Sequence, residues 1–209
     1  MKRRTLFLGG LTAACAGLFL NQGGPVRAEQ PVEPWAKRLI EAATAQVGVT
    51  VIYDPSYSRI DFPNGDVPRE RGVCTDVVIR AYRDAFGIDL QRLVNDDMRA
   101  AFPAYPKTWG LSRPDRNIDH RRVPNLERFL ERKGAAVPVS DVPDDYLPGD
   151  LVTQRLPGGL PHIGIVSDAR SSFGGTRPLL VHNIGAGARI EDVLFGFRIV
   201  GHFRFPPAA

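Results

Sequence analysis

The chain changes character about two thirds of the way along, and this change constrains the fold more than any other feature. Before residue 134, apolar residues recur at helical spacing in four segments, namely 33–47, 73–86, 89–102 and 124–133. After residue 149 the pattern becomes a set of short β-type runs, namely 150–152, 163–166, 179–181 and 195–205. Consecutive strands without helices between them connect by hairpins, so the sequence predicts an α+β domain with N-terminal helices packed on a C-terminal antiparallel sheet.

Residues that start and stop helices mark the ends of these segments. Asp89 stands at an N-cap position and Pro124 in a first turn, while glycines follow at positions 48, 87 and 134. Residues 49–53 form a short extended piece, and residues 54–68 form a loop rich in Pro, Gly, Asn and Asp. The loop ends at Gly72, so Cys74 is expected to open the second helix.

The first 28 residues have the pattern of an export signal. Lys2, Arg3 and Arg4 precede an apolar run over residues 6–20, and Val26-Arg27-Ala28 is a small-x-small cleavage site. The pair Arg3-Arg4, followed by Thr5-Leu6-Phe7, also fits a twin-arginine signal. We therefore expect export, with the mature protein in the periplasm or elsewhere in the cell envelope.

Removal of the signal would leave residues 29–209 as a single domain, because no linker or repeat divides them. Lipidation at Cys15 is an alternative, which Thr12 disfavours because a large aliphatic residue is usual at its position. No later segment approaches the ~20 apolar residues that a membrane span requires. The mature chain is expected to be a monomer without an integral membrane span.

The charge balance excludes nucleic acid as the expected partner. The whole chain has 27 Lys and Arg against 23 Asp and Glu, but four of the basic residues lie in the signal, which contains no acid. The mature balance is therefore 23 against 23. No basic excess remains to release counterions from a phosphate backbone.

Cys74 is the one cysteine outside the signal, so an intramolecular disulfide is excluded in the mature chain. An unpaired thiol in an oxidising compartment is either buried and inert or functional. A position at a helix N-terminus lowers the pKa of a thiol, and an imidazole partner lowers it further. His162 begins the strand Pro161-His162-Ile163-Gly164, where the sheet would orient its ring and Gly164 would admit a neighbouring backbone.

Four pieces of the chain, in order, resemble the NlpC-type cell-wall peptidases of the papain-like superfamily. They are Gly72-Val73-Cys74-Thr75-Asp76, Pro148-Gly149-Asp150-Leu151-Val152, Pro161-His162-Ile163-Gly164-Ile165-Val166 and Val181-His182-Asn183. From about residue 36 to 205 the chain also looks like the YijF-like bacterial family, catalogued as domain of unknown function 1287. Val73 and Asp76 depart from the acid and the glycine usual around the nucleophile, and about ten extra residues precede His182.

The resemblance implies a papain-like fold with Cys74 as nucleophile and His162 as base. A third polar residue would orient the imidazole, and it implies His182 in preference to its neighbour Asn183. Tyr53 would border the oxyanion site, or it would be a half-buried strand tyrosine. Asp76 would cap the helix N-terminus, or it would bind a substrate amine.

The remaining candidate residues form a basic cluster between residues 113 and 122. Arg113, Arg116, His120, Arg121 and Arg122 would either bind substrate carboxylates or form a solvated basic face. No His-Glu-x-x-His motif, paired cysteines or glycine-rich phosphate loop occurs, so the sequence predicts neither a metal nor another cofactor.

These features predict an exported cysteine hydrolase that cleaves an amide bond. The expected substrates are peptidoglycan stem peptides or other envelope peptides, and an endopeptidase is the preferred form. An amidase that frees the stem peptide from the glycan is the enzymatic alternative. A non-catalytic envelope binding module on the same fold is the alternative from another class.

Overall fold

A computed structural model describes residues 31–173 and 176–208. The predicted signal, residues 1–28 with Cys15, lies outside the described residues. Val32–Ala209 form one unit by their contacts. Among the described residues no helix combines the length and the apolar character needed to cross a bilayer.

The four predicted helices are confirmed, and each begins or ends within a few residues of its predicted bounds. They are α1 (Pro34–Thr44), α2 (Cys74–Phe86), α3 (Leu90–Ala101) and α4 (Val123–Arg132). Asp89 caps α3 by accepting a hydrogen bond from the N–H of Arg92, and Gly87 ends α2 in the left-handed conformation that favours glycine. Four single-turn 3₁₀ helices occupy loops: η1 (Phe102–Ala104), η2 (Asp119–Arg121), η3 (Pro143–Asp145) and η4 (Pro157–Gly159).

The predicted antiparallel sheet is also confirmed, and it has six strands in the order β3-β8-β4-β5-β6-β7. In chain order they are β3 (Ala136–Val137), β4 (Leu151–Arg155), β5 (Pro161–Arg170), β6 (Pro178–Asn183), β7 (Ala188–Glu191) and β8 (Arg198–Phe203). The sequence did not predict β3 and β7, because runs of two and four residues are too short to show a period of two. A separate parallel pair joins β1 (Ile52–Tyr53) to β2 (Arg71–Gly72), directly before α2.

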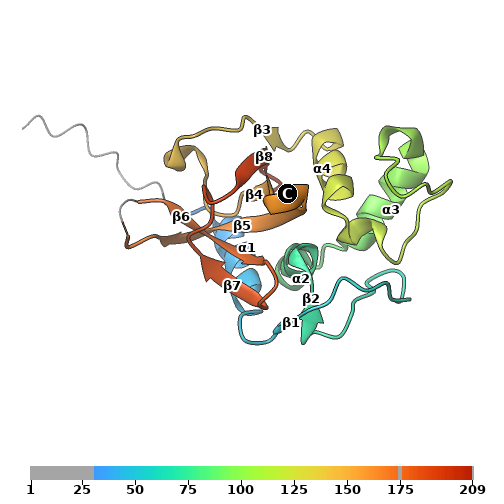
Figure 1. Ribbon diagram of the computed structural model, residues 1–209, viewed down its shortest axis with the longest axis horizontal. Coiled ribbons are helices and arrows are strands. Elements are labelled where there is room, and N and C mark those ends of the chain that lie inside the picture. Colours follow the sequence, from blue (N-terminus) through green and yellow to red (C-terminus); the bar gives the residue numbers. More distant parts are fainter. Residues whose placement is uncertain (1–30, 174–175, 209) are drawn as a thin grey trace, which may run out of the picture. The chain divides into compact units, whose positions relative to one another are not determined.

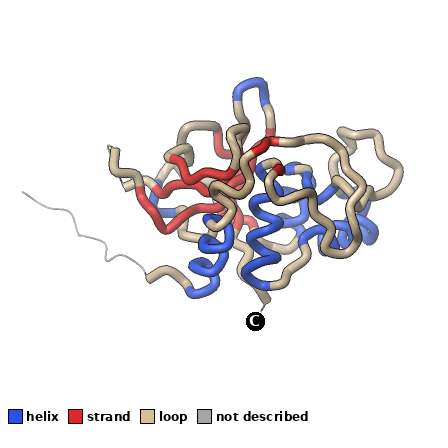
Figure 2. The backbone as a smooth tube through the Cα atoms, turned by 90° about the horizontal axis from the view of Figure 1, so that it is seen from below, coloured by secondary structure: helices blue, strands red, loops and turns tan. Residues whose placement is uncertain are grey.

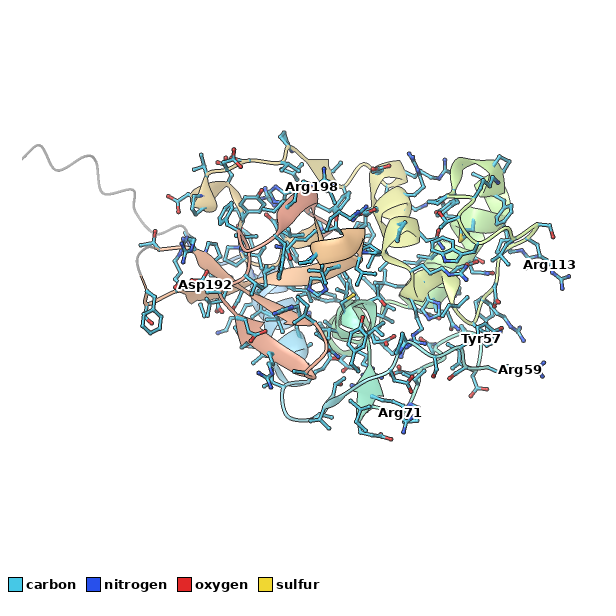
Figure 3. All side chains as sticks on the ribbon, viewed as in Figure 1. Tyr57, Arg59, Arg71, Arg113, Asp192 and Arg198 are labelled. Carbon is cyan, nitrogen blue, oxygen red and sulfur yellow. The ribbon has the colours of Figure 1, made fainter. Side chains whose placement is uncertain are left out.

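The helices pack on one face of the sheet, where α1, α2 and α4 contact β5 (Figures 1 and 2). Alternation along the strands sends Leu151, Ile163 and Val181 into the core under the helices. Their neighbours Val152 and Leu180 face a second, smaller cluster on the other side of the sheet. Side chains fill the space between helices and sheet (Figure 3), and each fully buried aliphatic side chain contributes about 1.5–3 kcal/mol.

Asp150 fixes the start of the central strand β4 and explains the Pro148-Gly149-Asp150 sequence. Its carboxylate is fully buried, accepts two hydrogen bonds from Arg204 at 2.8 Å, and lies 2.7 Å from His202 Nε2. It also accepts the N–H of Leu147 at 2.9 Å. Gly149 has φ +88°, and a Cβ there would lie 2.8 Å from Ala36 of α1, so only glycine allows this turn against the helix.

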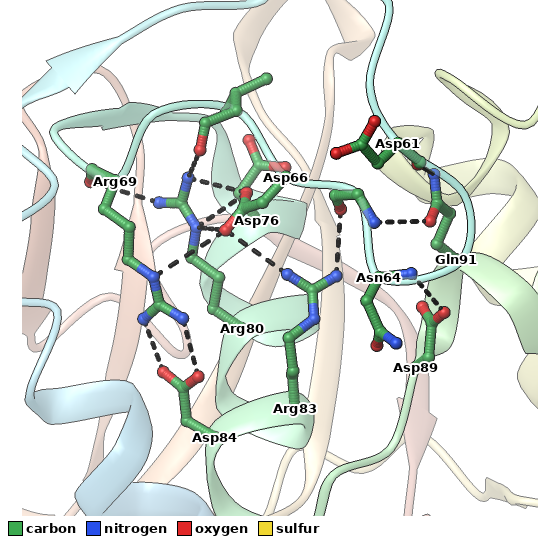
Figure 4. Close-up of polar contacts among 12 residues, drawn as sticks. Asp61, Asn64, Asp66, Arg69, Asp76, Arg80, Arg83, Asp84, Asp89 and Gln91 are labelled. Atoms are coloured by element: carbon green, nitrogen blue, oxygen red, sulfur yellow. Dashed lines mark hydrogen bonds and ion pairs between the residues drawn. The ribbon is translucent and has the colours of Figure 1, made fainter.

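Arg80 of α2 organises the loop that leads into Cys74 (Figure 4). Its side chain is fully buried and donates to the Asp66 carboxylate at 3.0–3.1 Å. It also donates at 3.0 Å to the carbonyls of Val67 and Arg71 and to the Thr50 hydroxyl. One guanidinium therefore satisfies the polar groups of a loop that has no regular structure of its own.

We predict that Arg80→Leu lowers the free energy of unfolding by about 3–5 kcal/mol, because it removes the nearest donors of the Asp66 carboxylate and leaves several carbonyls without a donor. Urea titration measures this loss. The matched control is Arg69→Gln, which breaks the partly exposed pair with Asp84 and should cost at most about 1 kcal/mol. Equal losses from the two variants would contradict the assignment of Arg80 as the centre of this loop.

Candidate active site

Cys74 is the first residue of α2, and the helix start is capped from within the helix. The Asp76 carboxylate accepts the N–H of Val73 at 2.7 Å, which is the capping role that the sequence favoured for it. The same carboxylate takes two hydrogen bonds of 2.9 Å from Arg121. Since both side chains are buried, Asp76 is occupied by Arg121 and is not free to bind a substrate amine.

Arg121 also holds the loop opposite the helix start. It donates to the carbonyls of Ser56 and Asp54 at 3.2 Å, and its own carbonyl accepts the Thr75 hydroxyl at 3.0 Å. The idea of a solvated basic face is therefore wrong for Arg121, which is 7% exposed. The guanidinium ties η2, the 54–56 loop and the start of α2 together around the cysteine.

The Cys74 thiol lies at the edge of a pocket of about 410 Å³. We call this the thiol pocket, and its wall includes Tyr53, Tyr57, Trp109, Arg121, Arg122 and Pro161. The thiol is free and only 4% exposed. The pocket brings together residues that are far apart in the sequence, from the first loop to the start of β5.

Burial raises the pKa of the Cys74 thiol to about 11, and the neighbouring Asp76 carboxylate contributes to the rise. The backbone groups of Ile163 and Thr75 act in the opposite direction by hydrogen bonding to the sulfur. The sequence predicted a lowered pKa from the helix N-terminus. That prediction is wrong for the resting site, because the loss of solvent outweighs the few backbone donors.

A chain of side chains leads away from the thiol along the sheet. His162, at the start of β5, places its Nε2 3.0 Å from Nδ1 of His182 on β6. Nε2 of His182 in turn lies 3.1 Å from Oε2 of Glu191 on β7, within ion-pairing distance although not aligned as a hydrogen bond. Ile163, the residue after His162, contacts the Cys74 sulfur through its backbone.

The Glu191 carboxylate determines which ring nitrogens of His182 and His162 carry hydrogen. A carboxylate only accepts, so the hydrogen of His182 belongs on Nε2, facing Glu191. Its Nδ1 then accepts from Nε2 of His162, which leaves Nδ1 of His162 with a lone pair. Among residues 31–173 and 176–208, Nδ1 of His162 has no hydrogen-bond partner, so it is available to take a proton from a thiol.

Both imidazoles are neutral in this environment. Burial, with a smaller contribution from the neighbouring His182, lowers the pKa of His162 to about 3. Burial also lowers the pKa of His182, while the Glu191 carboxylate opposes this shift. The resting site therefore contains a neutral thiol beside a neutral imidazole rather than a thiolate–imidazolium pair.

Asn183, the alternative third member, has a different role. Its amide donates to the carbonyl of Gly72 at 3.1 Å and accepts the N–H of Gly185 at 3.1 Å. It therefore ties β6 to the loop just before Cys74. The structure places His182, and not Asn183, against His162.

Tyr53 lines the thiol pocket, and 40% of the residue is exposed. Burial of the hydroxyl raises its pKa to about 12, with further contributions from Cys74 and Asp76 and an opposing one from Arg121. The hydroxyl is therefore a hydrogen-bond donor at any physiological pH. Its place in the wall of the thiol pocket suits stabilisation of a developing negative charge.

The other candidates lie away from the thiol. His120 is 2% exposed, and burial, then the neighbouring Arg121 charge, lowers its pKa to about 3. Arg113 and Arg116 are exposed and line a separate cleft. Among the residues that the structure describes, no three His, Cys, Asp or Glu side chains are grouped to hold a metal ion.

Of the three linked side chains His162, His182 and Glu191, only Glu191 was not predicted from the sequence. It lies on β7, which pairs with β6 so that His182 faces Arg189 and Leu180 faces Glu191. The glycines at 185 and 187 mark a turn, but the four residues Ala188–Glu191 that follow are too few for their alternation to establish a strand.

Fold and site together define an α+β protein with a free thiol at a helix start, in contact with the backbone of the strand that carries His162, and with a His162–His182–Glu191 series across three strands of an antiparallel sheet. The chain belongs to the family described as domain of unknown function 1287, whose model matches residues 40–205. A relative from Escherichia coli (strain K12), named "Uncharacterized protein YijF", is 54% identical over 167 residues, which is 80% of each chain.

The lowered imidazole pKa values predict that stability falls as the pH drops from about 6.5 toward 3. In that range the unfolded chain binds protons on His120 and His162 that the folded chain does not bind. Protonation therefore favours the unfolded chain, and the stability present above pH 6.5 is lost progressively as the pH falls toward 3. The free energy of unfolding, measured in urea at pH 7, 5.5 and 4, should fall less steeply in His120→Gln than in the parent. If the free energy of unfolding falls equally with pH in the parent and in His120→Gln, His120 is not buried and neutral.

Proposed function

We propose that this chain is an exported cysteine hydrolase with an NlpC-type, papain-like fold, which cleaves an amide bond in peptidoglycan stem peptides. The observation that carries the proposal is the juxtaposition at the start of β5. There the thiol touches the backbone of Ile163, and the adjacent His162 presents an unoccupied Nδ1 backed by His182 and Glu191. The export signal and the resemblance to cell-wall peptidases support the envelope as location and murein as substrate.

In the proposed reaction the Cys74 sulfur attacks the carbonyl carbon of the substrate while its proton moves to Nδ1 of His162. The new imidazolium is stabilised through His182 by the Glu191 carboxylate. Backbone N–H groups at the start of α2 and the Tyr53 hydroxyl are the donors for the oxyanion. The C–N bond then breaks and His162 gives its proton to the leaving amine. Water attacks the acyl carbon as His162 takes one of its protons, the C–S bond breaks to release the acid, and His162 returns that proton to the sulfur.

The neutral resting pair has a consequence for this mechanism. The thiol and imidazole pKa values favour the uncharged forms, so the thiolate forms during attack and not beforehand. A substrate that fills the thiol pocket and supplies the carbonyl carbon is then required for proton transfer. Such a site protects its thiol from oxidation in the envelope, since the thiolate is the form that oxidants attack.

Purified mature protein, incubated with sacculi and defined muropeptides, should release stem-peptide fragments that mass spectrometry identifies. Cys74→Ser and His162→Ala should each reduce turnover at least about a thousandfold, because nucleophile and base act as a unit. Glu191→Gln should reduce turnover less, because Glu191 acts through His182. Products cut between amino acids indicate the endopeptidase, and free intact stem peptide indicates the amidase. Identical products from the parent and Cys74→Ser would remove the hydrolase proposal.

A non-catalytic envelope binding module is the second candidate, and the burial of the sulfur favours it. A thiol that is 4% exposed with a pKa of about 11 is also what an inert core cysteine would show. The two functions differ in what His162 does. An active pair requires the imidazole to accept the thiol proton, whereas a packing cysteine is indifferent to it.

We predict that His162→Ala slows iodoacetamide labelling of Cys74 at pH 7–8 and leaves labelling near pH 11 almost unchanged, because the imidazole is needed only while the thiol is protonated. The matched control is His120→Ala, another buried histidine, which should leave the labelling profile as in the parent. Superimposable profiles for all three proteins would support the binding module.

A further inference from the structure

A second cleft lies next to the thiol pocket, and its charge is distinctive. It has a volume of about 770 Å³ and lies between α3, the 57–62 loop and the 111–117 loop. Four arginines line it: Arg59, Arg99, Arg113 and Arg116. We call it the arginine cleft. Figure 3 shows Arg59, Arg113 and Tyr57 at the same end of the domain.

The four guanidinium groups make no hydrogen bond or ion pair with any other described residue. Twelve of the twenty described arginines lie within 4.0 Å of a carboxylate, and four of the remaining eight line this one cleft. The one acid in the lining, Asp115, accepts from the Tyr57 hydroxyl at 3.1 Å and from the N–H of Asn117 at 2.9 Å. Four positive charges against one negative give this cleft an excess of three, on a mature chain whose total of 23 basic and 23 acidic residues is balanced.

The floor of the cleft also contains an unused polar group. Asn95 of α3 is 93% buried, since only 7% of it is exposed, and it lines the cleft. Its side-chain amide makes no hydrogen bond to any other described residue. Arg116 lies over the Phe62 ring, 5.7 Å from the centroid, so that its plane is supported while its N–H edge stays free. The Asn95 amide can therefore donate to or accept from a ligand in the cleft.

The arginine cleft and the thiol pocket share Tyr57 as a wall. That side chain is held in place because its hydroxyl contacts Asp115 and accepts from the Asn117 amide at 2.8 Å. A ligand that passes Tyr57 therefore reaches the thiol with one end and the arginines with the other. Guanidinium groups bind carboxylates in bidentate pairs, and several converging donors suit a ligand with more than one carboxylate.

We propose that the arginine cleft binds the carboxylate groups of the substrate next to its scissile bond, so that the enzyme selects acidic peptides with at least two free carboxylates. This inference rests on the hydrolase proposed above and names its substrate class. The positive excess is confined to a cleft with the volume of a short peptide. A chain with a balanced overall charge has no long-range attraction for a polyanion such as nucleic acid.

Binding is tested on the full mature chain with Cys74→Ser, so that no turnover is needed. The probe is a synthetic stem tetrapeptide with free carboxylates, compared by calorimetry with the same peptide in which the carboxylates are carboxamides. The free-acid peptide should bind at least about tenfold more tightly, with a Kd that rises with salt. The double variant Arg59→Gln/Arg113→Gln should remove this preference.

The matched control is Arg198→Gln, an exposed arginine on β8 without an ion pair among the described residues, which Figure 3 shows away from the cleft. It should leave the Kd unchanged. Equal affinity for the two peptides, or equal loss from control and cleft variants, would overturn the inference. Tighter binding of an oligonucleotide than of the acidic peptide would overturn it as well.

Kinetics separate this inference from the hydrolase itself. In the active enzyme the double arginine variant should raise KM at least about tenfold and leave kcat nearly unchanged, since the arginines touch only the part of the substrate that does not react. Unchanged KM with normal turnover would refute the arginine cleft and leave the hydrolase standing. Selective binding by Cys74→Ser without products from the parent would refute the hydrolase and leave the cleft as a peptide-binding site.

Discussion

The contact between the start of α2 and the start of β5 is the interaction on which the rest of the site depends. Cys74 and His162 are 88 positions apart, and the sulfur reaches the backbone of Ile163 only because α2 packs across the sheet there. Both partners are fixed by other groups. Asp76 and Arg121 hold the helix start, and Asn183 ties β6 to Gly72, two residues before the helix.

Burial is the common cause of the site's electrostatics. Most charged side chains inside the domain have an opposite charge within hydrogen-bonding distance, as in Arg80–Asp66, Arg121–Asp76 and Arg204–Asp150. Groups without such a partner are neutral, which applies to Cys74 and to His162. The arginine cleft is the exception on the surface, where four cations remain solvated and ready to pair.

Sequence reasoning reached the elements with strong local signals. The helices, the cap at Asp89 and the antiparallel sheet follow from periodicity and capping chemistry, which depend on neighbouring residues alone. Strand β7 was not predicted, because its four residues are too few to show a clear alternation, and the role of Glu191 was therefore not predicted either. Sequence reasoning also assigned His120 and Arg121 to a basic surface, because nothing local shows that the η2 turn lies in the interior.

The thiol pKa shows the same limit. A helix N-terminus is visible in the sequence and lowers the pKa of a thiol, whereas the desolvation that raises it comes from residues far away in the chain. The order of the motifs placed cysteine and histidine correctly relative to the helix and the strand. Only the folded chain shows how little water reaches them.

The central claim is that the Glu191 carboxylate sets the protons of both imidazoles, so that Nδ1 of His162 carries no hydrogen. ¹⁵N NMR of histidine-labelled protein reads these protons directly. The account predicts that His162 and His182 are both neutral Nε2–H tautomers at pH 7, and that His162 is still neutral at pH 5. An Nδ1–H tautomer or an imidazolium at His162 in the resting protein would contradict it.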